Sequence, residues 1–386
     1  MRLGSFEDAG IYSLTISYCN IFLIISCFGV RTYQVSNVND EHTHGDYIAA
    51  RGVTSAVALT LFFIFLLFMQ LSDYTLMCCL FLMFFKLTES CTDVFFGSFQ
   101  LMDRYRSIAV SYTVKGLLSF SFFCMGLRFF HSLMFAVLLM GLANLAAILV
   151  YDLPIMIRSR VNVRRTRFQD VRRILANCFP LMLYALISAF MYFLTRYAIE
   201  HRYSSEQLGY YASVSVVLTV FVTLTNAIWS VIAGWASNAY ANGEAALIGK
   251  YVAKILAGVF VSGALIVLLG CFAGEWGLSL LFGEAIVPYA FLLVPVLMIS
   301  VVLSAASFFS VLLISFKKRT PMMLANTVGA VLCAATAFPF VNAFGMLGAV
   351  ISLGAGASSQ MLFSMMIVFF SISKLKSKLK KQAAPS

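Results

Sequence analysis

The sequence predicts an all-helical protein that crosses a membrane many times, and two observations carry this prediction. Of its 386 residues, 61% are hydrophobic and only 11% are charged, whereas soluble domains hold about 45–50% apolar and about 25% charged residues. The apolar residues also fall into stretches of about 20, the length that an α-helix needs to cross a bilayer. We therefore expect a polytopic bundle, with connections too short to hide a catalytic domain.

Eleven apolar stretches are long enough to serve as spans. They cover residues 10–30, 52–72, 77–98, 108–127, 130–151, 175–197, 208–235, 251–273, 286–315, 321–341 and 346–373. The first stretch lacks the basic start and the cleavage site of a signal peptide, so we expect it to be a retained span. Almost all of the nine cysteines fall within the spans, without a CxxC pair, and we expect them to be small core residues.

Lysine and arginine gather on alternate connections, and this asymmetry predicts the orientation. If the segment 152–174 is cytoplasmic, about 20 of the 27 basic residues lie on that side, including the tail KLKSKLKK. The C-terminus is then cytoplasmic and the N-terminus lies outside. The net charge of +11 is explained by this topology and by contact with anionic lipid headgroups, so we expect no nucleic-acid partner.

An internal repeat divides the chain. AGIYSLTISYCNIFLIISCFG, from Ala9, aligns with LGYYASVSVVLTVFVTLTNAI, from Leu208, at an offset of 199. The aligned pairs are Gly10 with Gly209, Tyr12 with Tyr211, and Arg51 with Lys250. Both copies would run in the same direction across the membrane, which predicts two lobes related by an axis along the membrane normal.

The repeat sets the expected domain boundaries. Residues 1–151 would form an N-terminal lobe of five spans, 152–174 a basic cytoplasmic linker, 175–373 a C-terminal lobe of six spans, and 374–386 a basic tail. The span 175–197 has no partner in the first half. We therefore expect that this sequence lacks one helix of the first lobe, either because the start lies upstream or because the chain is a shortened form.

The stretch LMFFKLTESCTDVFFG, residues 82–97, carries three charges within an expected span. A charge at mid-membrane costs about 2.5–3.5 kcal/mol on insertion scales, so it is rarely left facing lipid. Lys86, Glu89 and Asp93 are spaced i, i+3, i+7, which places them within roughly 60° of one helix face. Lys115 lies at a similar depth on the next span, so we predict a Lys86–Glu89 pair and a Lys115–Asp93 pair. Such pairs either pin two helices together or line an aqueous cavity.

Three further cations lie near the ends of spans. Arg31 is either an interfacial anchor or a phosphate contact at a cavity mouth. Arg196 is either a snorkelling residue or part of the translocation path, and Lys254 can snorkel. The segment NDEHTHGDY, with Asp40, Glu41, His42, His44 and Asp46, has metal-ligand residue types. Without a helical i, i+4 histidine pair, we expect it to be a solvated polar loop.

The residue pattern favours a transporter over an enzyme. The expected outer loops are short, only four histidines are present, and no Walker motif, DxD-like metal site or nucleophile–base pair is found. We therefore expect no enzyme activity and no cofactor, although a coupling proton or sodium ion remains open. A parallel-repeat bundle with charges in one lobe is the plan of a secondary transporter or flippase.

Several segments resemble Wzx-type polysaccharide flippases of the multidrug/oligosaccharidyl-lipid/polysaccharide (MOP) exporter superfamily. In the first half these are LGSFEDAGIYSLTISYCNIFLIISCFGVRTYQVS, DYIAARGVTS and LTESCTDVFFGSFQLMDRYRSIAVSYTVKG. In the second half they are LGYYASVSVV, SLLFGEAIVPYAFLLVPVLMISVVLSAASFFSVLLISFKKRTPMMLANTVGAV and FGMLGAVISLGAGAS. The resemblance implies two six-helix lobes around a central cavity, twelve helices where this chain has about eleven.

The resemblance also implies a function. A flippase of this type would move polyprenyl-diphosphate-linked oligosaccharide across a bacterial plasma membrane for O-antigen, capsule or exopolysaccharide synthesis, by alternating access. Its partners would be membrane lipids and the glycosyltransferases and polymerase of the same pathway. Arg31, Lys86 and Lys115 would contact the diphosphate or sugar, with Glu89 and Asp93 setting their charge state or taking up a coupling ion. The alternatives are a cation-coupled multidrug exporter and a membrane-embedded polysaccharide polymerase or ligase.

Overall fold

A computed structural model describes residues 5–36, 42–159 and 167–382. In these ranges the chain is helical, with short turns between the helices. Eleven helical segments are long and apolar enough to cross a membrane, and each overlaps one of the eleven spans predicted from the sequence. The prediction of a polytopic helical membrane protein is therefore confirmed. Part of the expected basic linker, residues 160–166, lies outside the described residues, as do Asp40 and Glu41.

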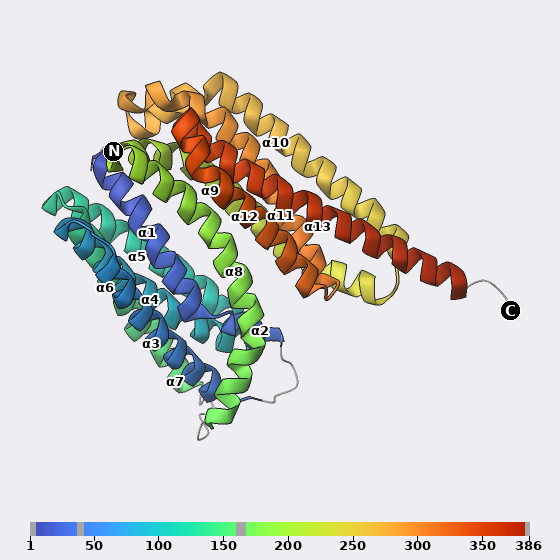
Figure 1. The fold of residues 1–386 in the computed structure, drawn as a ribbon. Coiled ribbons are helices and arrows are strands. Elements are labelled where there is room, and N and C mark those ends of the chain that lie inside the picture. Colours follow the sequence, from blue (N-terminus) through green and yellow to red (C-terminus); the bar gives the residue numbers. More distant parts are fainter. Residues whose placement is uncertain (1–4, 37–41, 160–166, 383–386) are drawn as a thin grey trace. The chain divides into compact units, whose positions relative to one another are not determined.

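The chain divides into two compact units, Arg2–Phe190 and Met191–Ser386, called here the N-terminal and C-terminal units. The N-terminal unit is built from the helices α1 to α7 and the first part of α8 (Figure 1), together with a π-helical turn, η1. Their bounds are α1 Phe6–Cys27, α2 Val30–Ser36, α3 His44–Phe68, α4 Asp73–Leu101, α5 Tyr105–Phe130, α6 Leu133–Ala147, η1 Ile148–Asp152, α7 Leu153–Arg158 and the first part of α8 Phe168–Arg202.

The C-terminal unit contains the end of α8, five further helices and a 3-10 segment, η2. Their bounds are α9 Ser205–Ala241, α10 Ala245–Phe282, η2 Glu284–Leu292, α11 Leu293–Ser315, α12 Arg319–Phe344 and α13 Met346–Gln382. Capping residues begin several helices in both units. Ser5 caps α1 in a reciprocal box with Asp8, and the Ser72 and Ser204 hydroxyls accept backbone N–H groups of α4 and α9.

The two units share one packing scheme. In the N-terminal unit α4 is central and packs on α1 and α6, while α5 packs on α6. In the C-terminal unit α11 packs in the same way on α9 and α13, while α12 packs on α13. This correspondence follows the predicted repeat, which aligns α1 with α9, and it makes α4 and α11 equivalent central helices.

A sharp break separates α1 from α2. Phe28 and Gly29 both adopt positive φ, at 50° and 70°, and the left-handed region ends an α-helix. A side chain at Gly29 would also meet Leu181 Cβ at 3.0 Å. The break redirects the chain so that Arg31, on the first turn of α2, approaches α4.

The cysteines only partly follow the expectation of core residues. All nine are free thiols. Five are buried and two are half-buried, but Cys91 and Cys271 are exposed. Both lie on apolar helices of a chain whose outer surface is itself hydrophobic, so an apolar neighbourhood in sequence does not identify the core face.

Candidate functional site: a charged cavity in the N-terminal unit

A cavity of about 380 Å³ lies within the N-terminal unit, bounded by α1, α4, α5 and α6. Its polar lining is concentrated on α4 and α5, with one residue from α6. The lining residues are Leu23, Cys27, Phe85, Glu89, Thr92, Asp93, Tyr112, Lys115, Gly116, Ser119 and Asn144. This cavity holds Glu89, Asp93 and Lys115 at membrane depth, and such charged walls favour polar contents over lipid.

The central helix α4 presents the predicted polar stripe. Lys86 Nζ lies 2.7 Å from Glu89 Oε2, which confirms the predicted Lys86–Glu89 pair. The two partners differ in exposure, because the Lys86 side chain is 9% exposed and that of Glu89 is 38% exposed. Glu89 lines the cavity. Lys86 does not line it, but its Nζ pairs with Glu89 and lies 5.4 Å from the centre of the Phe85 ring.

Asp93 has different partners from the one predicted. Its Oδ2 accepts a hydrogen bond from Arg51 Nη2 at 2.6 Å, and its Oδ1 lies 3.6 Å from Arg31 Nη1. The predicted Lys115–Asp93 pair is therefore wrong. Depth along the membrane permitted it, but two arginines from α2 and α3 already neutralise this carboxylate.

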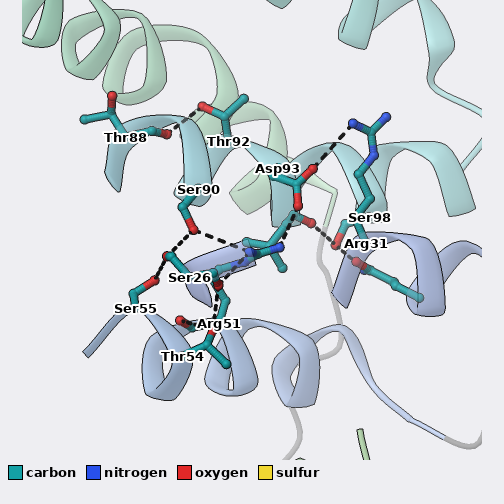
Figure 2. A network of polar contacts seen from close by, with 12 residues as sticks. Ser26, Arg31, Arg51, Thr54, Ser55, Thr88, Ser90, Thr92, Asp93 and Ser98 are labelled. Carbon is teal, nitrogen blue, oxygen red and sulfur yellow. Dashed lines mark hydrogen bonds and ion pairs between the residues drawn. The ribbon is translucent and has the colours of Figure 1, made fainter. Parts of the chain in front are cut away.

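Arg51 is a charged residue whose place in the site was not anticipated. It lies on α3 with its side chain only 3% exposed. Figure 2 shows it at the centre of a polar network that joins α1, α3 and α4. Arg51 Nη1 donates to the Ser26 carbonyl at 2.9 Å and lies 3.4 Å from Ser90 Oγ, while the hydroxyls of Ser26 and Ser90 are 2.6 Å apart. These contacts hold the guanidinium in place against Asp93.

Arg31 is held more loosely than Arg51. Its guanidinium is 3.4 Å from Gln100 Oε1 and 3.4 Å from the Tyr112 hydroxyl, and it lies 5.7 Å from the Phe96 ring centre. Tyr112 and Asp93 both line the cavity. Of the two readings left open for Arg31, a contact at the cavity edge therefore fits its position.

Lys115 pairs with Asp152, an acid that the sequence analysis left unassigned. Lys115 Nζ donates a short hydrogen bond to Asp152 Oδ2 and a second one, at 2.6 Å, to Thr92 Oγ1. Beside them Asn144 Nδ2 donates to Thr88 Oγ1 at 2.7 Å. Thus the ion pair joins α5 to η1, while Thr92 joins α4 to α5 and Thr88 joins α4 to α6.

Seven charged side chains make up this cluster: Arg31, Arg51, Lys86, Lys115, Glu89, Asp93 and Asp152. The predicted pairs contained two cations and two acids and summed to zero. The observed cluster has four cations against three acids and carries one net positive charge. All ion pairs found in the described part of the chain belong to it.

Arg196 lies on α8 in the C-terminal unit and does not line the cavity. It is half-buried, and Tyr192 and Tyr211 are near enough to interact with its charge. Its part in translocation stays a prediction. Tyr211, which the repeat aligns with Tyr12, is buried beside this arginine.

The metal-like segment is engaged in other contacts wherever the structure describes it. His44 Nδ1 is 3.0 Å from Ser98 Oγ, and Asp46 accepts two hydrogen bonds of 2.8 Å from Thr43 at the start of α3. His42 packs edge-on against Tyr47 at 6.0 Å. No group of three metal-ligating side chains occurs among the described residues.

Comparisons with known proteins fit this architecture. The family model described as "Polysaccharide biosynthesis protein" matches residues 5–237. The chain belongs to this family. It is also 25% identical, over 291 residues, to the capsular polysaccharide biosynthesis protein CapF of Staphylococcus aureus, covering 74% of this chain and 71% of that protein.

Solved structures of transporters share the fold of this family member. An inward-facing multidrug resistance MATE family transporter superposes with a TM-score of 0.70 at 12% identity, covering 98% of this chain and 95% of the other. A MOP superfamily transporter from Pyrococcus furiosus gives 0.65 at 13% identity, with 97% and 90% covered. The expected membership of a polysaccharide biosynthesis family is therefore confirmed by the family model, and the chain shares the helical fold of these transporters.

Proposed function

We propose that the protein moves polyprenyl-diphosphate-linked oligosaccharide across a bacterial plasma membrane by alternating access, with its C-terminus in the cytoplasm. The observation that carries the proposal is the cavity of the N-terminal unit together with the charged cluster around it, which has one net positive charge in total. A diphosphate is anionic and is bound by lysine and arginine. The sugar needs a hydrogen-bonding path, which Thr92, Ser119 and Asn144 provide, while the polyprenyl chain stays in lipid.

Within this proposal the cations differ in availability. Lys86 is held by the half-exposed Glu89, and Arg31 has polar contacts of 3.4–3.6 Å. Such contacts exchange at low cost, because the acid or amide left behind can bind water. An anionic headgroup would take these two cations first, and release of Glu89 and Asp93 would provide a two-state element for alternating access.

The alternative of a cation-coupled multidrug exporter is less well supported by the charge balance. A cavity for cationic drugs needs an excess of acids, because charges of like sign repel. The cavity wall carries Glu89, Asp93 and Lys115, but both acids are already paired with cations, and the cluster as a whole has an excess of one cation. A polysaccharide polymerase or ligase would instead need groups for glycosyl transfer, and the fold offers a transporter scaffold.

A leaflet assay in a deletion strain tests the proposal. Loss of a flippase traps lipid-linked repeat units in the cytoplasmic leaflet. Repeat units that reach the outer leaflet without being polymerised would instead identify a polymerase. Partner glycosyltransferases and the polymerase of the same pathway would be unaffected in the deletion strain.

A point substitution tests the cavity itself. Lys86→Ala should lower the flipping rate about tenfold or more at normal expression, the effect of losing one charge-assisted contact. Lys254→Ala is the matched control, because Lys254 is an exposed lysine on α10 of the C-terminal unit. Normal flipping by the Lys86 variant would contradict the assignment of the cavity as the substrate path.

A further inference from the structure

Asp152 is a fully buried acid inside a membrane-spanning segment. Its side chain is 0% exposed, and one oxygen, Oδ2, accepts a hydrogen bond from Lys115. The other oxygen, Oδ1, has no hydrogen-bond partner among the described residues. Burying a carboxylate so deeply is costly unless its charge is matched. Lys115 supplies that match, so the two residues act as one unit.

The π-helical turn η1 places Asp152 on the cavity side of its helix. Asn144, which lines the cavity, and Asp152 are eight residues apart, and in a regular α-helix they would point about 80° away from each other. A π-turn accommodates one extra residue, so the two side chains come to lie within about 20° of the same face. A regular helix would place Tyr151 there instead. The irregular turn ends at Asp152 itself.

Lys115 has one N–H left after its two hydrogen bonds, and its Nζ also lies 5.3 Å from the centre of the Phe96 ring. An ammonium group has three N–H donors, and those of Lys115 reach Asp152 Oδ2 and Thr92 Oγ1. The residue also lines the cavity. Two anchored donors therefore fix where the third points. This differs from Lys86, whose partner Glu89 is 38% exposed and can turn to water.

We propose that Asp152 is a positioning residue for Lys115. It keeps the ammonium fixed and charged with its third N–H available to an anionic group in the cavity, and it stays bound when that group arrives. In this respect the inference rests on the proposed function, because the anionic group is the diphosphate of the lipid-linked substrate. Lys115 is the fixed cation of the cavity, whereas Lys86 and Arg31 are the exchangeable ones.

The first test needs no ligand. The purified full chain is treated briefly with acetic anhydride at pH 8, and acetylation of each lysine is followed by mass spectrometry. Asp152→Asn should raise the acetylation rate of Lys115 at least about tenfold, since the amine loses a charge-assisted hydrogen bond. Asp152→Glu should keep the rate near that of the unmodified chain. Lys86 is the internal control, and its rate should not change.

The second test measures the affinity for inorganic pyrophosphate by calorimetry on the same full-chain proteins. Asp152→Asn and Lys115→Met should each weaken binding by about tenfold. The double variant should bind no more weakly than Lys115→Met alone, because Asp152 acts through Lys115. A purely structural role for Asp152 would weaken binding equally in both backgrounds.

The outcomes separate the two proposals. An unchanged Lys115 acetylation rate in Asp152→Asn, or a rise shared by Lys86, would overturn the positioning role whatever pyrophosphate does. Additive losses of affinity would overturn it as well. Absence of pyrophosphate binding by the unmodified chain, with the acetylation result as expected, would count against the diphosphate-binding function and leave the positioning role standing.

Discussion

The helices α4 and α11 occupy equivalent central positions in the two units, yet their contents differ. Each packs on two neighbouring helices of its own unit. α4 carries Lys86, Glu89 and Asp93, whereas α11 carries no charged residue and buries only serines among its polar side chains. The unit can therefore be built without buried charge. Buried ion pairs contribute little net stability when compared with apolar packing, so those of α4 are better explained by function.

The space beside these helices differs as well. In the C-terminal unit the end of α8 covers α12 and α13, with the Tyr197 and Phe338 rings 6.3 Å apart and the Met191 side chain against Gly356. In the N-terminal unit the equivalent helices are α5 and α6, and the cavity lies beside them. Among the described residues, one packing scheme thus places aromatic and apolar contacts beside α12 and α13, and a cavity lined by charged side chains beside α5 and α6.

The largest effect should come from placing a charge on α11. Ser304 is completely buried there, and its hydroxyl has no hydrogen-bond partner among the described residues. Ser304→Asp should cost several kcal/mol, because the new carboxylate would have no cation beside it. Expression and thermal unfolding in detergent would measure the loss, with Ser304→Ala as the control. Tolerance of the aspartate would show that α11 accepts charge as α4 does.

A large but smaller effect is expected on α4. Asp93→Asn would leave the buried Arg51 without its carboxylate, at a cost of about 3–5 kcal/mol. Removing both partners in Arg51→Met with Asp93→Leu should recover most of that stability, since the unpaired charge is gone. Thermal unfolding midpoints of the unmodified chain, Asp93→Asn and the double variant would measure these changes in stability. Equal midpoints for the single and double variants would mean that the pair is not coupled.

The smallest effect distinguishes the serines of the two helices. Ser90 on α4 contacts Ser26 at 2.6 Å and Arg51 at 3.4 Å, whereas Ser300 on α11 donates to the carbonyl of Leu297 in its own helix at 2.7 Å. Ser90→Ala should lower stability by about 1 kcal/mol. Ser300→Ala should change it by less than about 0.5 kcal/mol. The comparison fails if both variants lose the same amount.

The sequence was sufficient to predict the spans and the stripe on α4. Hydrophobic length identified all eleven apolar helices, and helical periodicity placed Lys86, Glu89 and Asp93 on one face. The Lys86–Glu89 pair followed because i, i+3 neighbours on one helix meet without any knowledge of tertiary structure. Features that depend on a single helix could therefore be predicted from the sequence.

The partners of Asp93 and Lys115 depended on tertiary contacts. Arg51 opens a predicted span, where a basic residue ordinarily marks the cytoplasmic border, so its burial was not expected. Asp152 faces Lys115 only because of the π-turn, which shifts the helical phase and leaves no clear signal in sequence. Membrane depth alone is compatible with two acidic partners for Lys115. One is Asp93 on the preceding span, and the other is Asp152 at the end of the following span.

Gly116, which lines the cavity on α5 next to Lys115, gives experimental control over its size. A Cβ built there has nothing within 4 Å, and alanine in place of a helical glycine favours the helix by roughly 0.5–1 kcal/mol. Alanine, valine and phenylalanine at this one position would therefore narrow the cavity in graded steps while every ion pair stays in place. The size of headgroup that the protein accepts can be calibrated in this way.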